Sequence, residues 1–107
     1  MSSGLLGSAD LAATTNTTVY TVPSSVQVDD LTVRFTNRNA TAVTVRLAIC
    51  ATATPGNAEY IEYGYTIQPN GVLMNSGIIV QQNKLIVAYA SATGVSIAVL
   101  GNERKLA

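Results

Sequence analysis

Residues 30–50 read DLTVRFTNRNATAVTVRLAIC, and this stretch decides the fold. In both of its halves every second residue is apolar, as in LTVRF and VTVRL, and the residues between are mostly Thr or Arg. Because successive side chains of a β-strand point to opposite faces, each half predicts a strand with one face in a core, over residues 30–37 and 41–50. The short polar link NRNA between them predicts an antiparallel hairpin.

The same pattern continues outward from this stretch. Short runs rich in Val, Ile, Thr and Tyr recur along the chain, separated by Gly, Pro, Asn and Asp. This punctuation predicts an all-β domain, an antiparallel β-sandwich of jelly-roll or immunoglobulin-like type with about seven strands. Several connectivities suit seven strands of this size. The predicted strands span residues 17–22, 30–37, 41–50, 60–67, 72–80, 84–91 and 95–100.

The two ends of the chain lack this pattern. Residues 1–16, MSSGLLGSADLAATTN, show neither a strand nor a helix period, which predicts an extended N-terminal arm. Residues 17–101 then form the sandwich domain, and residues 102–107 form a short charged C-terminal tail.

The amino-acid composition indicates which binding partners are not expected for this protein. The chain has 107 residues, enough for one core, and six basic residues balance six acidic ones. A net charge of zero removes the attraction that supplies most nonspecific affinity for nucleic acid or anionic lipid, so we expect neither partner. Residues 1–13 do not resemble a signal peptide, and the longest apolar run, residues 85–90, is too short to span a bilayer. We expect a soluble protein that is made and used without export.

The sequence contains few side chains that could support catalysis. The chain has no histidine and one cysteine, Cys50, which removes the usual zinc or copper ligands and any internal disulfide. Lys84 and Lys105 lie in a turn and in the tail, where solvation is the simpler role. The adjacent carboxylates Asp29 and Asp30 would point to opposite faces of a strand, and no phosphate-binding glycine loop is present. We therefore predict a protein that is not an enzyme and needs no metal or cofactor.

The last two predicted strands are apolar on both faces. In LIVAYA, residues 85–90, the face opposite Leu85, Val87 and Tyr89 is also apolar. A strand buried on two sides needs a cover, either the N-terminal arm or a neighbouring subunit. The alternative is that the alanines simply tolerate solvent. The residues predicted to form a partner or oligomer interface are Leu5, Leu6, Leu11, Ile86, Ala88, Ala90, Ala98 and Leu100.

One aromatic cluster is a candidate for sugar binding. Tyr63 and Tyr65 share the parity of Ile61 and Ile67, which predicts that they fill the core or a subunit contact. Tyr60 falls on the other face, where it is available to stack on a sugar ring.

Four segments carry a resemblance to known proteins: LLGSADLAATTNTTVYTVP, ATAVTVRLAI, EYIEYGYTIQPNGVL and IVAYASATGVSIAVLG. Together they cover much of the chain from Leu5 to Gly101, and they resemble small structural proteins of tailed bacteriophages, including phages of marine bacteria and cyanobacteria. The resemblance implies a virion subunit present in many copies, with a β-sandwich or jelly-roll-like body and no cofactor.

With this resemblance, the sequence predicts a non-enzymatic capsid decoration or cement protein located in the virion. Its partners would be the major capsid protein or other virion proteins and its own copies, in a symmetric oligomer such as a trimer. Deleting residues 1–13 is then expected to leave a folded domain that no longer binds particles. The alternatives are a tail, neck or fibre component and a carbohydrate-binding module for host attachment that uses Tyr60.

Overall fold

The structure, a computed structural model, describes residues 3–106. Within this range the chain forms eight strands and one short 3-10 helix, η1. The strands are β1 (Ser3–Leu11), β2 (Thr17–Thr21), β3 (Val26–Asn37), β4 (Val43–Cys50), β5 (Tyr60–Ile67), β6 (Val72–Val80), β7 (Leu85–Ala90) and β8 (Val95–Lys105), and η1 spans Asn57–Glu59.

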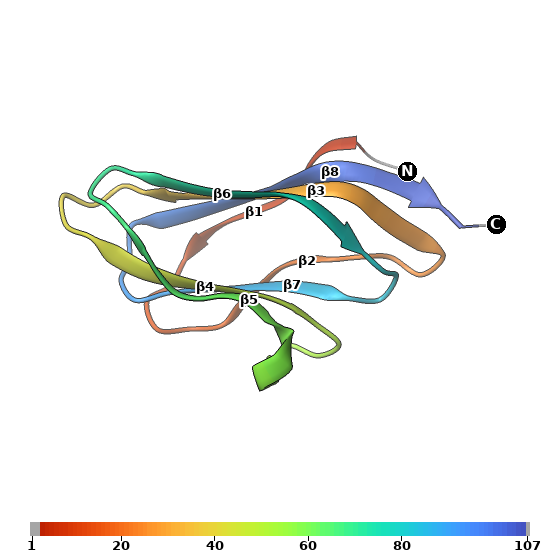
Figure 1. Cartoon of the computed structure of the whole chain (residues 1–107), viewed down its shortest axis with the longest axis horizontal. Helices are drawn as coiled ribbons and strands as arrows, with labels where there is room; N and C mark the ends of the chain where they lie inside the picture. The colour runs from red at the N-terminus through yellow and green to blue at the C-terminus, as the bar shows by residue number, and fades with distance from the viewer. Residues whose placement is uncertain (1–2, 107) are drawn as a thin grey trace.

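The strands form two stacked sheets of four (Figure 1). Sheet A has the order β1-β8-β3-β6 and sheet B the order β2-β7-β4-β5, and neighbouring strands are antiparallel throughout. The chain passes from one sheet to the other at every connection except the one between β4 and β5. The predicted all-β antiparallel sandwich is confirmed, and its interleaved strand order is that of a jelly roll.

The core lies between the sheets and is built from alternate residues of their strands. Val33 and Phe35 of β3 point into it from sheet A, and Val45 and Leu47 of β4 point into it from sheet B. Phe35 is fully buried, so truncating it to Ala is expected to cost about 3–5 kcal/mol. The alternating pattern in the sequence therefore marks the inner face of each sheet.

The predicted hairpin between residues 30–37 and 41–50 is wrong, because β3 and β4 lie in different sheets. Their link crosses the sandwich and is held by Asn37, a fully buried side chain. Its Nδ2 donates to the carbonyl oxygens of Thr41 (2.9 Å), Ile67 (3.2 Å) and Gln68 (3.1 Å). Alternating apolar residues look the same in a hairpin and in strands that face each other across a core, so periodicity alone does not separate the two.

The predicted N-terminal arm is also corrected. Residues 3–11 form β1, which pairs with β8 along its length and completes sheet A. Gly7 brings β1 against β2: a Cβ atom at Gly7 would lie 2.6 Å from the carbonyl oxygen of Val19. Residues 1 and 2 lie outside the described range.

The predicted C-terminal tail, residues 102–107, is largely strand. β8 continues to Lys105, which pairs with Val26 of β3. Residue 107 lies outside the described range. The domain boundaries predicted at residues 16 and 101 therefore do not separate structured from unstructured chain, because strands continue on both sides of the predicted body.

Candidate functional site

The outer face of sheet A is a surface of apolar and small residues around one arginine. Because β3 alternates, Arg34 points away from the core between buried Val33 and Phe35. It is paired with Met74 of β6 on one side and Ala98 of β8 on the other. We call this surface the sheet A face; it comprises Leu5, Ser8, Asp10, Arg34, Thr36, Val72, Met74, Ile79, Ser96, Ala98 and Leu100.

A shallow hollow of about 380 Å³ lies in the sheet A face. Its lining includes small residues of neighbouring strands, Ser8 of β1 and Ser96 and Ala98 of β8, together with Arg34 and Thr36 of β3. Within residues 3–106, Arg34 makes no ion pair or hydrogen bond through its side chain. The hollow thus offers a cation, several hydroxyl groups and room for one side chain of a partner.

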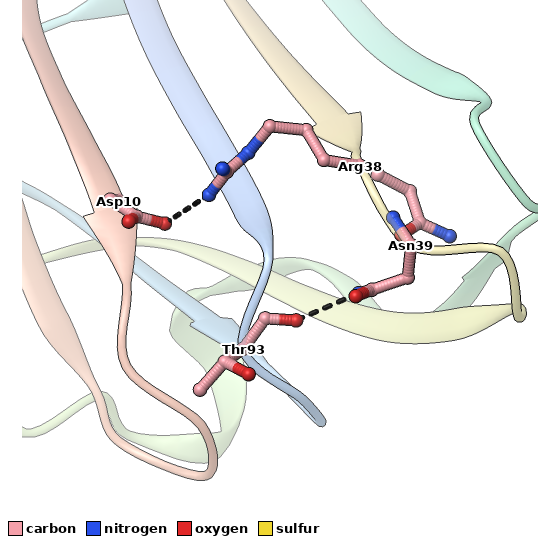
Figure 2. A network of polar contacts seen from close by, with 5 residues as sticks. Asp10, Arg38, Asn39 and Thr93 are labelled. Atoms are coloured by element: carbon pink, nitrogen blue, oxygen red, sulfur yellow. Dashed lines mark hydrogen bonds and ion pairs between the residues drawn. The ribbon is translucent and has the colours of Figure 1, made fainter.

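One end of the hollow is fixed by a polar network (Figure 2). Arg38, just after β3, donates from its guanidinium to the carboxylate of Asp10 in β1, which lines the hollow. Asn39 donates from Nδ2 to the carbonyl oxygen of Thr93 at 2.7 Å. These contacts tie the link after β3 to β1 and to the turn before β8, so the edge of the hollow is held in place by three separate segments.

Three of the predicted interface residues lie on the sheet A face. Leu5 is 60% exposed, and Ala98 and Leu100 are half-buried on the outer side of β8. The sequence predicted that Ala98 and Leu100 lie on the outer face of their strand, and the structure agrees. Leu5 reaches the same surface from β1, opposite Leu100.

The other predicted interface residues do not reach an outer surface. Leu6 is half-buried and packs against the core. The prediction is wrong for the remaining four, which are buried in the core between the sheets: Leu11, Ile86, Ala88 and Ala90.

The error for β7 has a clear physical reason. Both faces of this strand are buried, and the inner face is the one with Ile86, Ala88 and Ala90. Val87 on the outer face packs with Ala48 and Cys50 in a second small cluster, flanked by Tyr60 and Leu85. The second apolar face of β7 is therefore covered by residues of the same chain.

Sequence reasoning missed the exposed apolar residues of β6. Val72 (46% exposed), Met74 (60%) and Ile79 (65%) all point outward from sheet A. The sequence did contain a sign of them, because VLMNSGIIV has six apolar side chains, including Met74, and no charge. The interruption at Asn75, Ser76 and Gly77 hid their alternation.

The outer face of sheet B carries a cluster of tyrosines around Arg46. The guanidinium carbon of Arg46 lies 4.4 Å from the ring centroid of Tyr63 and 4.2 Å from that of Tyr89, within cation–π range. Tyr60 meets Tyr63 edge to face, with centroids 4.9 Å apart. We call these four residues the tyrosine platform.

Tyr63 and Tyr65 were predicted to fill the core or a subunit contact, and the structure excludes the core. Tyr63 is 65% exposed and Tyr65 is 46% exposed. Gly64 between them has φ +76 and lies where the register with β4 shifts, so the two rings leave opposite faces of β5. The candidate glycan contact Tyr60 is half-buried and joins Tyr63 rather than standing alone.

The titratable groups with shifted pKa values have structural roles. The hydrogen bond from Arg104, and then that from Gln27, lowers the pKa of Asp29. The backbone N–H groups of Gly56 and Ala51 bind the carboxylate of Glu59 and lower its pKa. Burial raises the pKa of the Cys50 thiol, which keeps it protonated and unreactive.

Residues 3–106 offer neither a cluster of metal-binding side chains nor a membrane-spanning helix. In that part of the chain no three His, Cys, Asp or Glu residues are grouped so that they could hold a metal ion. Nor does any helix there have the length and apolar character needed to cross a membrane.

The fold and its two outer faces define a jelly-roll domain with candidate binding surfaces on both sheets. No protein-family model, curated protein or solved structure matches the chain. The features that bear on function are therefore the outer faces of the two sheets and the resemblance in the sequence.

Proposed function

We propose that this protein is a non-catalytic structural subunit that docks onto other protein chains through the sheet A face. The observation that carries the proposal is the composition of that face: it carries exposed Leu5, Met74 and Ile79. It also contains a hollow lined in part by Arg34, whose side chain has no ion-pair or hydrogen-bond partner within residues 3–106. Protein interfaces are enriched in Met and Arg and depleted in Lys and Glu, and this face has no lysine or glutamate. Its hollow suits a single anchoring side chain of the partner.

The more specific proposal is a tailed-phage virion protein that decorates and stabilises the head shell. Its support is the resemblance of the sequence segments to phage structural proteins. The jelly roll adds a fold-level argument, because viral capsid domains commonly use it, although one fold serves many functions. The partner is then the major capsid protein or another virion protein, together with further copies of this chain. The zero net charge argues against nucleic acid or a membrane as the partner.

Binding to particles that lack the protein tests this proposal. The purified chain is expected to bind such particles, and Ala98→Arg is expected to weaken binding at least tenfold because it fills the hollow and adds a charge beside Arg34. Ala98 is half-buried on the outer face, so the variant should fold. Tyr63→Ser, on the opposite sheet, is the control and should bind like the wild type. Equal binding by Ala98→Arg and the wild type would exclude the sheet A face.

The location of bound protein separates the head from the tail. Image reconstruction of the reconstituted particles is expected to place the chain on the head shell in many copies. Density confined to the neck, tail or fibres would replace the decoration role with that of a tail, neck or fibre component.

The tyrosine platform favours a second candidate function, binding of host polysaccharide. Tyrosine rings stack on the apolar faces of sugars, and Arg46 adds hydrogen-bond donors beside Tyr63 and Tyr89. Jelly rolls also occur as lectin domains. A glycan-array screen tests this function: binding that is lost in Tyr63→Ala and Tyr60→Ala but kept in Tyr65→Ala would support it. No bound glycan at high protein concentration would reject it.

A further inference from the structure

Within residues 3–106, β6 is an edge strand of sheet A, and no strand pairs with its outer side. It ends the order β1-β8-β3-β6, so the backbone groups on its outer side have no strand beside them (Figure 1). It is nine residues long, and Val72, Met74 and Ile79 are exposed along it. A long, apolar, uncharged edge is a template for pairing with another strand.

The other edge strands carry features that hinder such pairing. β1 has a bulge between Leu5 and Gly7 and a charge at Asp10. β2 is five residues long and also has a shifted register. β5 contains Glu62 and two register shifts against β4. Charges, bulges and short length are the usual means of protecting an edge, and residues 68–83 around β6 contain no charged residue at all.

The pairing of β6 with β3 has two register shifts. One comes from an extra residue in β3 between Val28 and Leu31, and the other comes from an extra residue in β6, which makes β6 self-complementary. Ser76 and Gly77 (φ +74) bulge between the pairs Val33–Asn75 and Leu31–Ile78, so the alternation of inward and outward side chains reverses there. Leu73 and Asn75 point inward before the bulge, and Val80 does so after it.

Because the alternation reverses at this point, β6 can pair antiparallel with β6 of a second copy about a twofold axis between Asn75 and Ser76. This pairing would place outward Val72 opposite outward Ile79 of the second copy, and inward Leu73 opposite inward Ile78. In an unbulged strand the same register would set an exposed side chain against a buried one, because sheet partners share a face.

We propose that β6 pairs antiparallel with β6 of a second copy, joining two A sheets into one sheet of eight strands. The pairing places Val72 beside Ile79 and Met74 beside Gly77 of the second copy, and the uncharged flanks bring no like charges together. It deepens the proposed function by naming the contact through which the subunit self-associates.

Light scattering and sedimentation on the full chain test the pairing. The wild type is expected to have twice the chain mass of 11.1 kDa, and Met74→Lys/Ile79→Lys is expected to be a monomer. Both replaced side chains are exposed, so the variant should keep its fold. Leu5→Lys is the matched control: Leu5 is exposed to the same extent as Met74 but lies on the opposite edge, and this variant should remain a dimer.

A cross-link tests the register. In Val72→Cys/Ile79→Cys each introduced thiol faces its counterpart across the axis, so mild oxidation is expected to give a covalent dimer. The two sites lie seven residues apart on one extended strand, about 23 Å, which prevents a bond within the chain. Met74→Cys/Ile79→Cys carries the same number of thiols out of register and should not cross-link. Cys50 is buried and does not compete.

Each outcome decides the inference. A wild-type monomer, a trimer, or a dimer that survives Met74→Lys/Ile79→Lys would overturn the β6 pairing. A monomer that still binds particles through the sheet A face would leave the proposed function standing, whereas a β6 dimer that binds no particle would overturn that function and keep the pairing.

Discussion

Asn37 is the single buried polar side chain within residues 3–106, and its contacts join the link after β3 to the end of β5. Its amide group donates to the carbonyl oxygens of Thr41, two residues before β4, of Ile67 at the end of β5 and of Gln68 in the turn that follows. Its Oδ1 accepts from the backbone N–H of Asn39 at 2.9 Å. One side chain therefore holds the crossing from sheet A to sheet B.

Asn37→Asp is expected to lower the free energy of unfolding by more than about 3 kcal/mol at pH 7, since it buries a charge and sets an acceptor against carbonyl oxygens. Burial would raise the folded-state pKa of the new carboxyl, so part of the loss should return as the pH falls and the group becomes a donor. Urea unfolding at pH 7 and pH 4 measures both effects. Exposed Asn70→Asp is the control, expected within about 0.5 kcal/mol of the wild type. A fully stable Asn37→Asp would show that the amide donors are dispensable.

Tyr20 links the two sheets at the other end of the sandwich and predicts an alkaline loss of stability. Its hydroxyl donates to the carboxylate of Glu103. Burial, and then the bond to Glu103 and its charge, raise the pKa of Tyr20 above its ordinary value of 10.0. A raised folded-state pKa contributes stability that is complete below the unfolded-state pKa and is lost as the pH rises beyond it.

The free energy of unfolding is therefore expected to fall as the pH rises above about 10, where the unfolded chain ionises first. Tyr20→Phe should be less stable at pH 7 by about 1 kcal/mol and should fall less steeply above pH 10. Urea titrations between pH 7 and 11 give both quantities. Tyr65→Phe, whose hydroxyl has no hydrogen-bond partner within residues 3–106, should keep the wild-type slope. Equal slopes for Tyr20→Phe and the wild type would contradict the assignment.

At the scale of the element, β1 changes what the N-terminus does. It places Leu11 in the core and covers the outer edge of β8 with eight paired positions. A segment first expected to reach a neighbour is instead part of sheet A.

Deletion of residues 2–11 is accordingly expected to abolish cooperative unfolding rather than only particle binding. It removes a buried leucine, worth about 2–5 kcal/mol, and leaves the edge of β8 open. Circular dichroism during urea unfolding tests this outcome. A synthetic peptide of residues 1–13 should restore the transition by strand addition. A truncated chain with the wild-type midpoint would mean that β1 is dispensable for folding.

The inner face of a strand could be predicted where apolar and polar residues alternate without interruption. It could not be predicted where a bulge shifts that alternation. The core faces of β3 and β4 follow from alternation alone. β1 has no visible period because its register shifts after Leu5, and the shift at Gly64 places Tyr63 and Tyr65, which were expected to share a face, on opposite faces. In β7 both faces are apolar, so alternation gave no preferred inner side.

At the scale of the whole molecule, the strand order could not be predicted from the sequence. Alternation shows which side chains of a strand share a face, but it does not show which strands pair with one another. The sheet A face could be found only in part for the same reason: Ala98 and Leu100 showed their parity, while Arg34 and Met74 became neighbours only through the pairing of β3 with β6. Binding surfaces that depend on several strands emerge only once the strand order is known.

The β6 pairing makes a thermodynamic prediction for the assembled molecule. If only folded chains dimerise, association stabilises them by mass action, so the Tm should rise with protein concentration. A tenfold increase adds about 1.4 kcal/mol per dimer, or about 0.7 kcal/mol per chain, and for a domain of this size that corresponds to about 3–5 °C. Calorimetry on the wild type from micromolar to near-millimolar concentration should show this shift. Met74→Lys/Ile79→Lys should melt at one temperature throughout, whereas Leu5→Lys should follow the wild type. A concentration-independent Tm for the wild type would mean that its folded state does not depend on a second copy.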